Sequence, residues 1–282
     1  MNIPEISAAE AAAFINHGEW IGVGGFGPAG APKTIPPAIA AKARKEHEAG
    51  HPFKVNIVTG ASIGASCDGE LAAADAIDQR LPFSVNPEIR KAYNSGRVRY
   101  TDLNLSDNAT FLRQGLTGPV DWGIIEACDI QEVRGRVRIF LTAGIGIAPT
   151  ICHSARKGVF VELNTWHSTK LIGMHDIYEI EAPWYRSPIR ITQPVEIIGM
   201  PYIEVSPEHI KGIILTHQPD EARSMTPSTE TTDCIGQHMA DFLVDNMQRG
   251  YINSKKLILQ SGVGSGANAV LGALGQCSEV PD

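Results

Sequence analysis

Short apolar runs alternate with amphipathic segments along the first 220 residues. The runs have the length of buried strands, and the segments between them place apolar residues at helical spacing. Alternating strands and helices predict an α/β fold, with a mostly parallel sheet and helices on both faces. We expect strands at 20–23, 55–59, 98–101, 123–127, 137–142, 159–163 and 210–215, and helices at 7–17, 36–48, 86–93, 106–114 and 148–156.

One stretch departs from this alternation. Residues 165–207 contain Pro183, Pro188, Pro194, Pro201 and Pro207. Proline lacks a backbone N–H and disfavours helix both at its own position and at the residue before it. We therefore expect this stretch to be an extended excursion from the fold.

The C-terminal part repeats the order of elements found at the start. We expect a helix from Ser228 to about Gln248, with an apolar stripe that includes Ile235, Met239, Phe242 and Leu243. A strand at 257–260, a glycine loop and a helix at 267–274 follow, as helix, strand, glycine loop and helix do within 7–48. We predict an N-terminal domain at 1–222 and the start of a second, related α/β domain at 223–282, which we expect to be incomplete. Chance similarity between two common strand–loop–helix units is the alternative.

Composition narrows the class of protein. Of the 282 residues, 43% are hydrophobic and 20% charged, and the net charge of −7 gives no support for nucleic-acid binding. The densest basic spot, 134–138, is interpreted as a solvated strand edge. Five scattered cysteines without a C-x-x-C pair argue against disulfides and structural zinc. We find no secretory signal and no membrane-length apolar run, and expect a cytoplasmic protein without membrane contact.

Two glycine motifs match known fingerprints without the context these require. Gly22-x-Gly24-x-x-Gly27 fits the dinucleotide pattern, but prolines delay the next helix and the second strand ends without an acidic residue. Residues 60–64 (GASIG) fit a serine nucleophile elbow, yet His217 and His238 would complete a triad only by assumption. We favour a glycine-containing loop that shapes a ligand site.

Other polar residues are weaker candidates. His153, His167 and the pair His175-Asp176 lack the helical spacing of a metal site, so we expect no metal and prefer loop or core-edge roles for them. Glu126 is expected to end a strand on the side where α/β sheets bind ligands. Either a site role or a solvated strand end fits that position.

Residues 24–32 (GGFGPAGAP) resemble the G-G-F-x-x-x-G-x-P signature of family I coenzyme A transferases. The rest of the chain is similar to their acetyl-CoA hydrolase/transferase branch, which includes succinyl-CoA:acetate CoA-transferases. The resemblance covers essentially all 282 residues. Its matching segments are 61–64, 68–71, 80–83, 86–87, 102–106, 125–127, 161–164, 173–178, 199–203 and 260–264.

This resemblance implies two related α/β domains and a CoA-transferase that moves coenzyme A between short-chain carboxylic acids, with acetyl-, propionyl- or succinyl-CoA and acetate or succinate as substrates. A glutamate would attack the thioester and form a glutamyl-CoA intermediate. Coenzyme A is then a substrate, and no covalently bound cofactor is expected. The resemblance implies that CoA is contacted by Gly262, Val263, Gly264, Ser265 and Gly266. It also implies that the reacting acyl group lies beside Gly24, Gly25, Phe26 and Gly27. The N–H groups of this second set would stabilise the oxyanions that form during the reaction.

The family's nucleophilic glutamate lies about one helix and one strand beyond the second glycine loop, so the catalytic residue stays unassigned here. Glu279, in Ser278-Glu279-Val280, is only faintly similar to it and lies too close to Gly266. We expect the isolated chain to be inactive or incomplete. We also expect it to form a homo-oligomer or to pair with a complementary C-terminal half. An acetyl-CoA hydrolase and a non-catalytic subunit or fragment are the alternatives.

Overall fold

The computed structural model describes residues 3–181, 183–221, 226–253, 255, 257–262 and 264–277. The chain forms two compact units, Met1–Ala222 and Arg223–Asp282. Glu279 lies outside the described residues.

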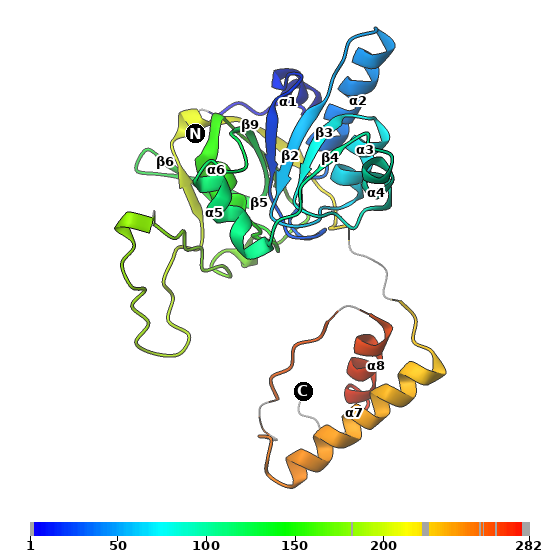
Figure 1. Cartoon of the computed structure of the whole chain (residues 1–282). Coiled ribbons are helices and arrows are strands. Elements are labelled where there is room, and N and C mark those ends of the chain that lie inside the picture. Colours follow the sequence, from blue (N-terminus) through cyan, green and yellow to red (C-terminus); the bar gives the residue numbers. More distant parts are fainter. Residues whose placement is uncertain are drawn as a thin grey trace. The chain divides into compact units, whose positions relative to one another are not determined.

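The first unit is an α/β layer structure (Figure 1). Its strands are β1 (Trp20–Val23), β2 (Val55–Thr59), β3 (Ile77–Leu81), β4 (Arg99–Tyr100), β5 (Val120–Val133), β6 (Arg136–Leu141), β7 (Ala155–Asn164), β8 (Ile203–Val205) and β9 (Ile210–Thr216). Its helices are α1 (Ala8–Phe14), α2 (Ile35–Glu48), α3 (Glu70–Ala73), α4 (Pro87–Asn94), α5 (Leu105–Arg113) and α6 (Ala148–Ser154), with a π-helical turn at Ala65–Gly69 and 3-10 turns at Thr169–Leu171, Pro183–Tyr185 and Pro207–His209.

The sheet is mostly parallel, as predicted. Seven strands pair in parallel in the order β4-β3-β2-β1-β5-β7-β9. The second half of β5 instead pairs antiparallel with β6, which pairs antiparallel with β8. The carboxyl ends of the seven parallel strands therefore share one edge, where α/β sheets commonly bind ligands.

Helices cover both faces, because successive side chains of each buried strand point in opposite directions. Helices α1 to α4 pack with Ile21, Ile57 and Ile124 in one apolar core. Helices α5 and α6 pack with Ile125 and Val161 in the other (Figure 1). The predicted α/β architecture with helices on both faces is confirmed.

Local sequence explains where several elements begin. Ser7 and Glu10 form the predicted capping box at the start of α1. Asn86 caps α4 with its side chain, and Pro87 occupies the first turn, where a missing N–H costs nothing. Among the described residues of the stretch 165–207, the helical and strand elements are 3-10 turns and the short β8, in agreement with the predicted extended excursion.

The second unit contains α7 (Glu230–Gln248) and α8 (Ser265–Leu274), which pack against one another. Gly236 allows this approach, because a Cβ there would lie 2.5 Å from the carbonyl oxygen of Ala269. The predicted strand at 257–260 is wrong: these residues form no strand. Strands need a hydrogen-bonding neighbour, and the described part of this unit offers only helices.

Two sequence expectations change in detail. Strands β3 and β8 were not predicted, and β5 runs to Val133 instead of ending at Glu126.

None of the described helices combines the length and apolar character needed to cross a membrane.

Candidate functional site

The first glycine loop follows β1 at the carboxyl edge of the sheet and leads into α2. Gly25, Gly27 and Gly30 have φ values of +95°, +59° and +64°, which side chains other than glycine adopt only at a cost. Gly24 and Gly25 are buried, whereas the Phe26 side chain is 53% exposed. The loop thus presents an exposed apolar side chain from a closely packed backbone. A dinucleotide fingerprint requires a helix directly after its glycines, but α2 begins only at Ile35.

A second loop, residues 142–147, supports this first loop from behind. A Cβ on Gly144 would lie 2.2 Å from the carbonyl oxygen of Ala29, and one on Gly146 would lie 2.1 Å from that of Gly25. Real Cβ atoms do not approach backbone so closely. The two loops therefore pack backbone against backbone, which requires glycine at both positions.

A buried ion pair holds the end of the glycine loop. The Nζ of Lys33 lies 2.5 Å from Oε2 of Glu126 and 3.1 Å from Oδ1 of Asp220. The Lys33 and Glu126 side chains are 2% and 0% exposed. Removing either partner would leave a buried charge without its counterion, so the pair constrains the path of the loop.

Glu126 is a mid-strand residue of β5, not the solvated strand end that the sequence left open. Its carboxylate accepts hydrogen bonds from the Thr142 hydroxyl at 2.8 Å and the Asn164 amide at 3.0 Å. Asn164 also bonds both backbone groups of Gln218. One buried carboxylate thereby connects strands β5 and β7, the loop after β6 and the segment after β9.

Glu162, beside Glu126 in the β5–β7 register, caps the start of α2. Its carboxylate accepts the backbone N–H groups of Lys33, Thr34 and Ile35 at 2.7 to 3.1 Å. Burial raises the pKa of Glu162, and these N–H groups partly oppose the rise. A carboxylate at a helix N-terminus satisfies donors that lack partners within the helix, and it fixes α2 on the sheet.

Three ionisable groups at this place have the spacing of metal ligands. Ligand atoms of Glu126, His167 and Asp220 lie within 4.8 Å of one another. The Lys33 ammonium already lies between the two carboxylates, so a cation is supplied by the chain itself. We interpret this group as an ion-pair cluster.

The loop after β2 is fixed by a second buried ion pair. Arg80 bonds Asp68 through Nε at 2.7 Å and Nη2 at 3.0 Å, and both side chains are fully buried. Asp68 also accepts the N–H of Ile63 and the Ser84 hydroxyl. Ser62 bonds Ser84 and the N–H of Val85. These contacts give Ser62 a structural role instead of a place in a serine triad.

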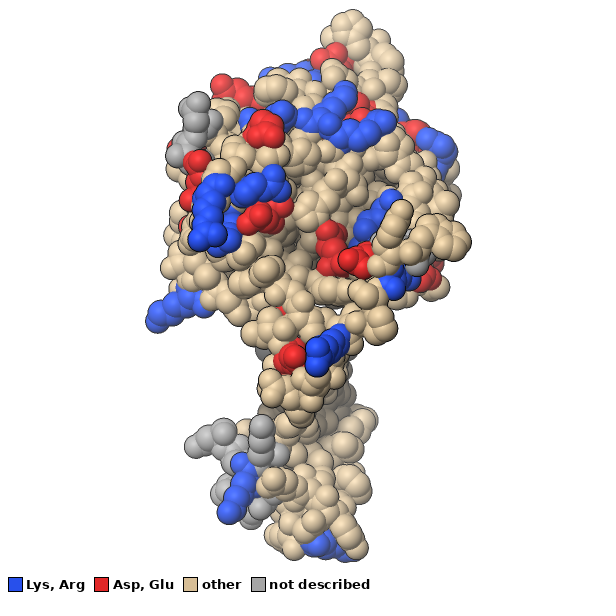
Figure 2. Space-filling view, turned by 90° about the vertical axis from the view of Figure 1, so that its left-hand side faces the viewer, with Lys and Arg blue, Asp and Glu red and all other residues tan. Residues whose placement is uncertain are grey.

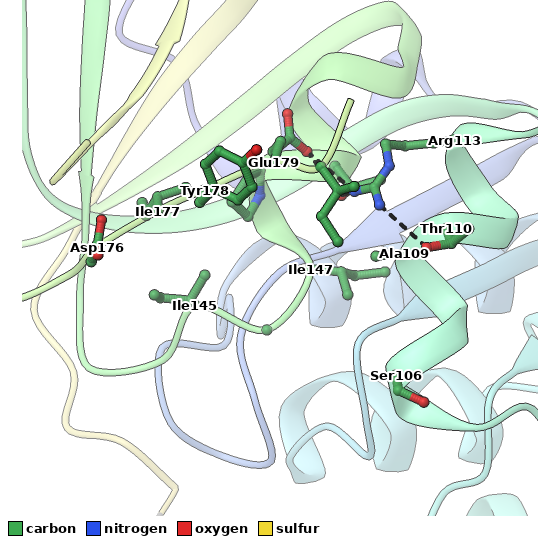
Figure 3. A pocket seen from close by; sticks show the side chains of 14 residues that line it. Ser106, Ala109, Thr110, Arg113, Ile145, Ile147, Asp176, Ile177, Tyr178 and Glu179 are labelled. Atoms are coloured by element: carbon green, nitrogen blue, oxygen red, sulfur yellow. Dashed lines mark hydrogen bonds and ion pairs between the residues drawn. The ribbon is translucent and has the colours of Figure 1, made fainter. Parts of the chain in front are cut away.

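A cavity of about 250 Å³ lies between α5, α6 and residues 176–180 (Figure 3). Arg113 and Glu179 extend toward one another across it, with Nη1 and Oε1 3.9 Å apart. Thr150 bonds both side chains, and His153 pairs with Glu179. The hydrogen bond between His153 and Glu179 raises the pKa of the His153 imidazole. Burial would raise the pKa of Glu179, but the contacts with His153, Thr150 and Arg113 lower it overall.

The second glycine loop belongs to the other unit. Gly264 has a φ of +143°, and Ser265 and Gly266 open α8. A Cβ on Gly262 or Gly266 would meet no atom within 4 Å, while Val263 lies outside the described residues. The prediction that this loop and the one at 24–27 share a ligand stays a prediction.

Sequence reasoning singled out Glu126 as a possible site residue but missed Lys33 and Asp220, the other anchors of the first loop. Lys33 and Glu126 are 93 residues apart in sequence, and Asp220 is 187 residues from Lys33. Glu162 and Asn164 offered a signal, since polar residues at the carboxyl end of a parallel strand often lie at a site.

On the face viewed in Figure 2, basic and acidic side chains are interspersed.

Sequence comparisons find relatives of this chain over most of its length. The family model of the acetyl-CoA hydrolase/transferase N-terminal domain matches residues 4–214. Propanoyl-CoA:succinate CoA transferase of Escherichia coli is 36% identical over 276 residues, which are 98% of this chain and 55% of that protein. Acetyl-CoA hydrolase of Schizosaccharomyces pombe is 33% identical, over 93% of this chain and 50% of that protein. The chain spans about half the length of the curated relatives it matches.

Solved structures show the same fold at lower identity. RipA from Yersinia pestis superposes with a TM-score of 0.61 at 16% identity, over 98% of this chain and 55% of that one. The acyl-CoA transferase YdiF of Escherichia coli O157:H7 gives a TM-score of 0.53 at 12% identity, over 96% of this chain and 59% of that one.

Proposed function

Because the chain belongs to the acetyl-CoA hydrolase/transferase family, we propose that it forms part of a CoA-transferase acting on short-chain carboxylic acids. The substrates would be acetyl-, propionyl- or succinyl-CoA with acetate or succinate. The observation that carries this proposal is the glycine loop at the carboxyl end of β1, held in place by the buried Lys33–Glu126 pair. That loop lies within the matched family domain.

In this proposal, a glutamate attacks the thioester carbonyl of the acyl-CoA. Loss of the CoA thiolate gives an acyl-glutamyl anhydride, and attack of that thiolate on the glutamyl carbonyl releases the carboxylate and leaves glutamyl-CoA. A second carboxylate reverses these steps and leaves as the new acyl-CoA. Each attack places negative charge on a carbonyl oxygen, which preorganised N–H groups stabilise. We assign this role to the loop of Gly24, Gly25, Phe26 and Gly27. Its Gly25 and Gly27 N–H groups would serve, because those of Gly24 and Phe26 bond the carbonyl oxygens of Ile124 and Ala29.

We assign the CoA contacts to Gly262, Val263, Gly264, Ser265 and Gly266. The nucleophilic glutamate would be supplied by sequence beyond this loop or by another chain. Glu126 is a poor nucleophile here, because both carboxylate oxygens are bonded and the side chain is buried.

The partner would be a second copy or a complementary C-terminal half. The exposed apolar stripe on α7 supports this proposal. Ile235, Met239 and Phe242 are 48%, 42% and 58% exposed, and they share one helix face by their spacing. An apolar helix face of this kind is typical of a surface that packs against further protein.

The second candidate is an acetyl-CoA hydrolase, which the relatives of that name support. Incubation with acetyl-CoA, with and without succinate, separates the two activities. A transferase forms succinyl-CoA only when succinate is present, whereas a hydrolase releases free CoA without any carboxylate.

The assay should be run on the 282-residue chain and on the native protein after its intact mass is measured. We expect little or no turnover by the isolated chain. Brisk turnover would contradict a nucleophile supplied from outside the chain. It would make Glu279 or Glu70 a candidate before the buried and fully bonded Glu126. A native protein that leaves acetyl-, propionyl- and succinyl-CoA intact, with and without a carboxylate acceptor, would refute the proposed function.

A further inference from the structure

The segment that leaves β9 crosses the carboxyl edge of the sheet and contacts three other connections. Gln218 exchanges hydrogen bonds with Asn164 at the end of β7. Asp220 contacts the glycine loop after β1, and Glu221 contacts the loop after β2. We call residues 217–221 the exit segment, because the first unit ends at Ala222.

Asp220 bonds the first glycine loop at two places. Its Oδ1 accepts the backbone N–H of Gly30 at 3.2 Å and lies 3.1 Å from Nζ of Lys33. Lys33 is itself buried against Glu126. One carboxylate of the exit segment thus holds both the backbone and the anchoring lysine of this loop.

Glu221 bonds the second loop in a similar way. Its carboxylate accepts the Ser66 N–H at 3.0 Å and also the Ser66 hydroxyl. It lies directly over Gly64, where a Cβ would come within 1.9 Å of Oε2. Glycine at position 64 therefore leaves the space that the Glu221 carboxylate occupies.

We propose that Asp220 and Glu221 are positioning residues, through which the exit segment sets the placement of both glycine loops at once. Two adjacent carboxylates bond two loops that are about 36 residues apart in sequence, Gly30 and Ser66. A displacement of the exit segment therefore moves both loops together. The consequence for acyl-group binding rests on the proposed function, but the coupling between the loops does not.

The test is hydrogen–deuterium exchange of the 282-residue chain, read by peptide. We expect Asp220→Ala and Glu221→Ala each to speed exchange at least about tenfold in both loops, 24–34 and 60–69. Glu221→Gln keeps an oxygen acceptor for the Ser66 N–H and should restore most of the protection. Gly64→Ala, which displaces the carboxylate while leaving Glu221 in place, should reproduce the Glu221→Ala pattern.

Glu46→Ala is the matched control, because Glu46 pairs with His51 at the far end of α2. It should leave both loops unchanged. Faster exchange in only the loop that each residue contacts would overturn the proposal, and so would a uniform increase across the whole first unit. If Asp220→Ala prevents folding, Glu221→Gln and Gly64→Ala still decide between these outcomes. Coupled loops together with a native protein that leaves acyl-CoA intact would refute the proposed function and leave this inference standing.

Discussion

Lys33→Met removes the positive charge from the buried cluster while keeping a side chain of similar length. Glu126 would then carry a buried charge that accepts hydrogen bonds from Thr142 and Asn164, at 2.8 and 3.0 Å, with Nε2 of His167 3.4 Å away. Removing one partner of a buried ion pair typically costs 3 to 5 kcal/mol. Because these two hydrogen bonds remain, we expect the first unit to lose about 3 kcal/mol of unfolding free energy.

Denaturant unfolding followed by tryptophan fluorescence measures this loss. All four tryptophans, at 20, 122, 166 and 184, belong to the first unit, so the signal reports that unit. The double variant Lys33→Met/Glu126→Gln removes both charges and should be more stable than Lys33→Met alone by at least about 1 kcal/mol. Lys91→Met, at an exposed pair with Glu88, is the control and should change stability by less than about 0.5 kcal/mol. A loss below about 1 kcal/mol for Lys33→Met would refute the reasoning.

Two further predictions concern the supporting loop and the cavity. Gly144→Ala places a Cβ 2.2 Å from the Ala29 carbonyl oxygen, so we expect a loss of about 1 to 3 kcal/mol in the same unfolding experiment. Lys91→Met, at the exposed pair with Glu88 in the same unit, is its control; equal effects of the two substitutions would contradict the backbone contact. The raised pKa of His153 gives stability that is complete below its ordinary value of about 6.5 and is lost as pH rises through the raised value. The lowered pKa of Glu179 gives stability that is lost as pH falls below about 4.5. The His153–Glu179 contact should thus be strongest between these two values, and an NMR titration of His153 that shows an unshifted or lowered pKa would rule it out.

The sequence predicted the sheet well, because most of its strands are short apolar runs buried on both faces. It missed β3, whose Asp78, Gln79 and Arg80 interrupt the apolar pattern. Arg80 is tolerated in the core because Asp68, 12 residues earlier, neutralises it. A local pattern cannot show such a tertiary contact.

The strand predicted at 257–260 failed for a related reason. Its composition favours a strand, but strand formation depends on a hydrogen-bonding neighbour, which local sequence does not supply. The candidate site was likewise only partly predictable from local sequence. The glycine motif at 24–30 was visible in the sequence, whereas its anchors Lys33, Glu126 and Asp220 come together only through the topology of the sheet.

The central proposal is that the glycine loops at 24–30 and 260–266 each bind the acyl-CoA substrate. Hydrogen–deuterium exchange of the 282-residue chain, with and without acetyl-CoA, tests it most directly. The account predicts slower exchange at both 24–30 and 260–266 when acetyl-CoA is present. Unchanged exchange at either loop, with or without protection elsewhere, would contradict it.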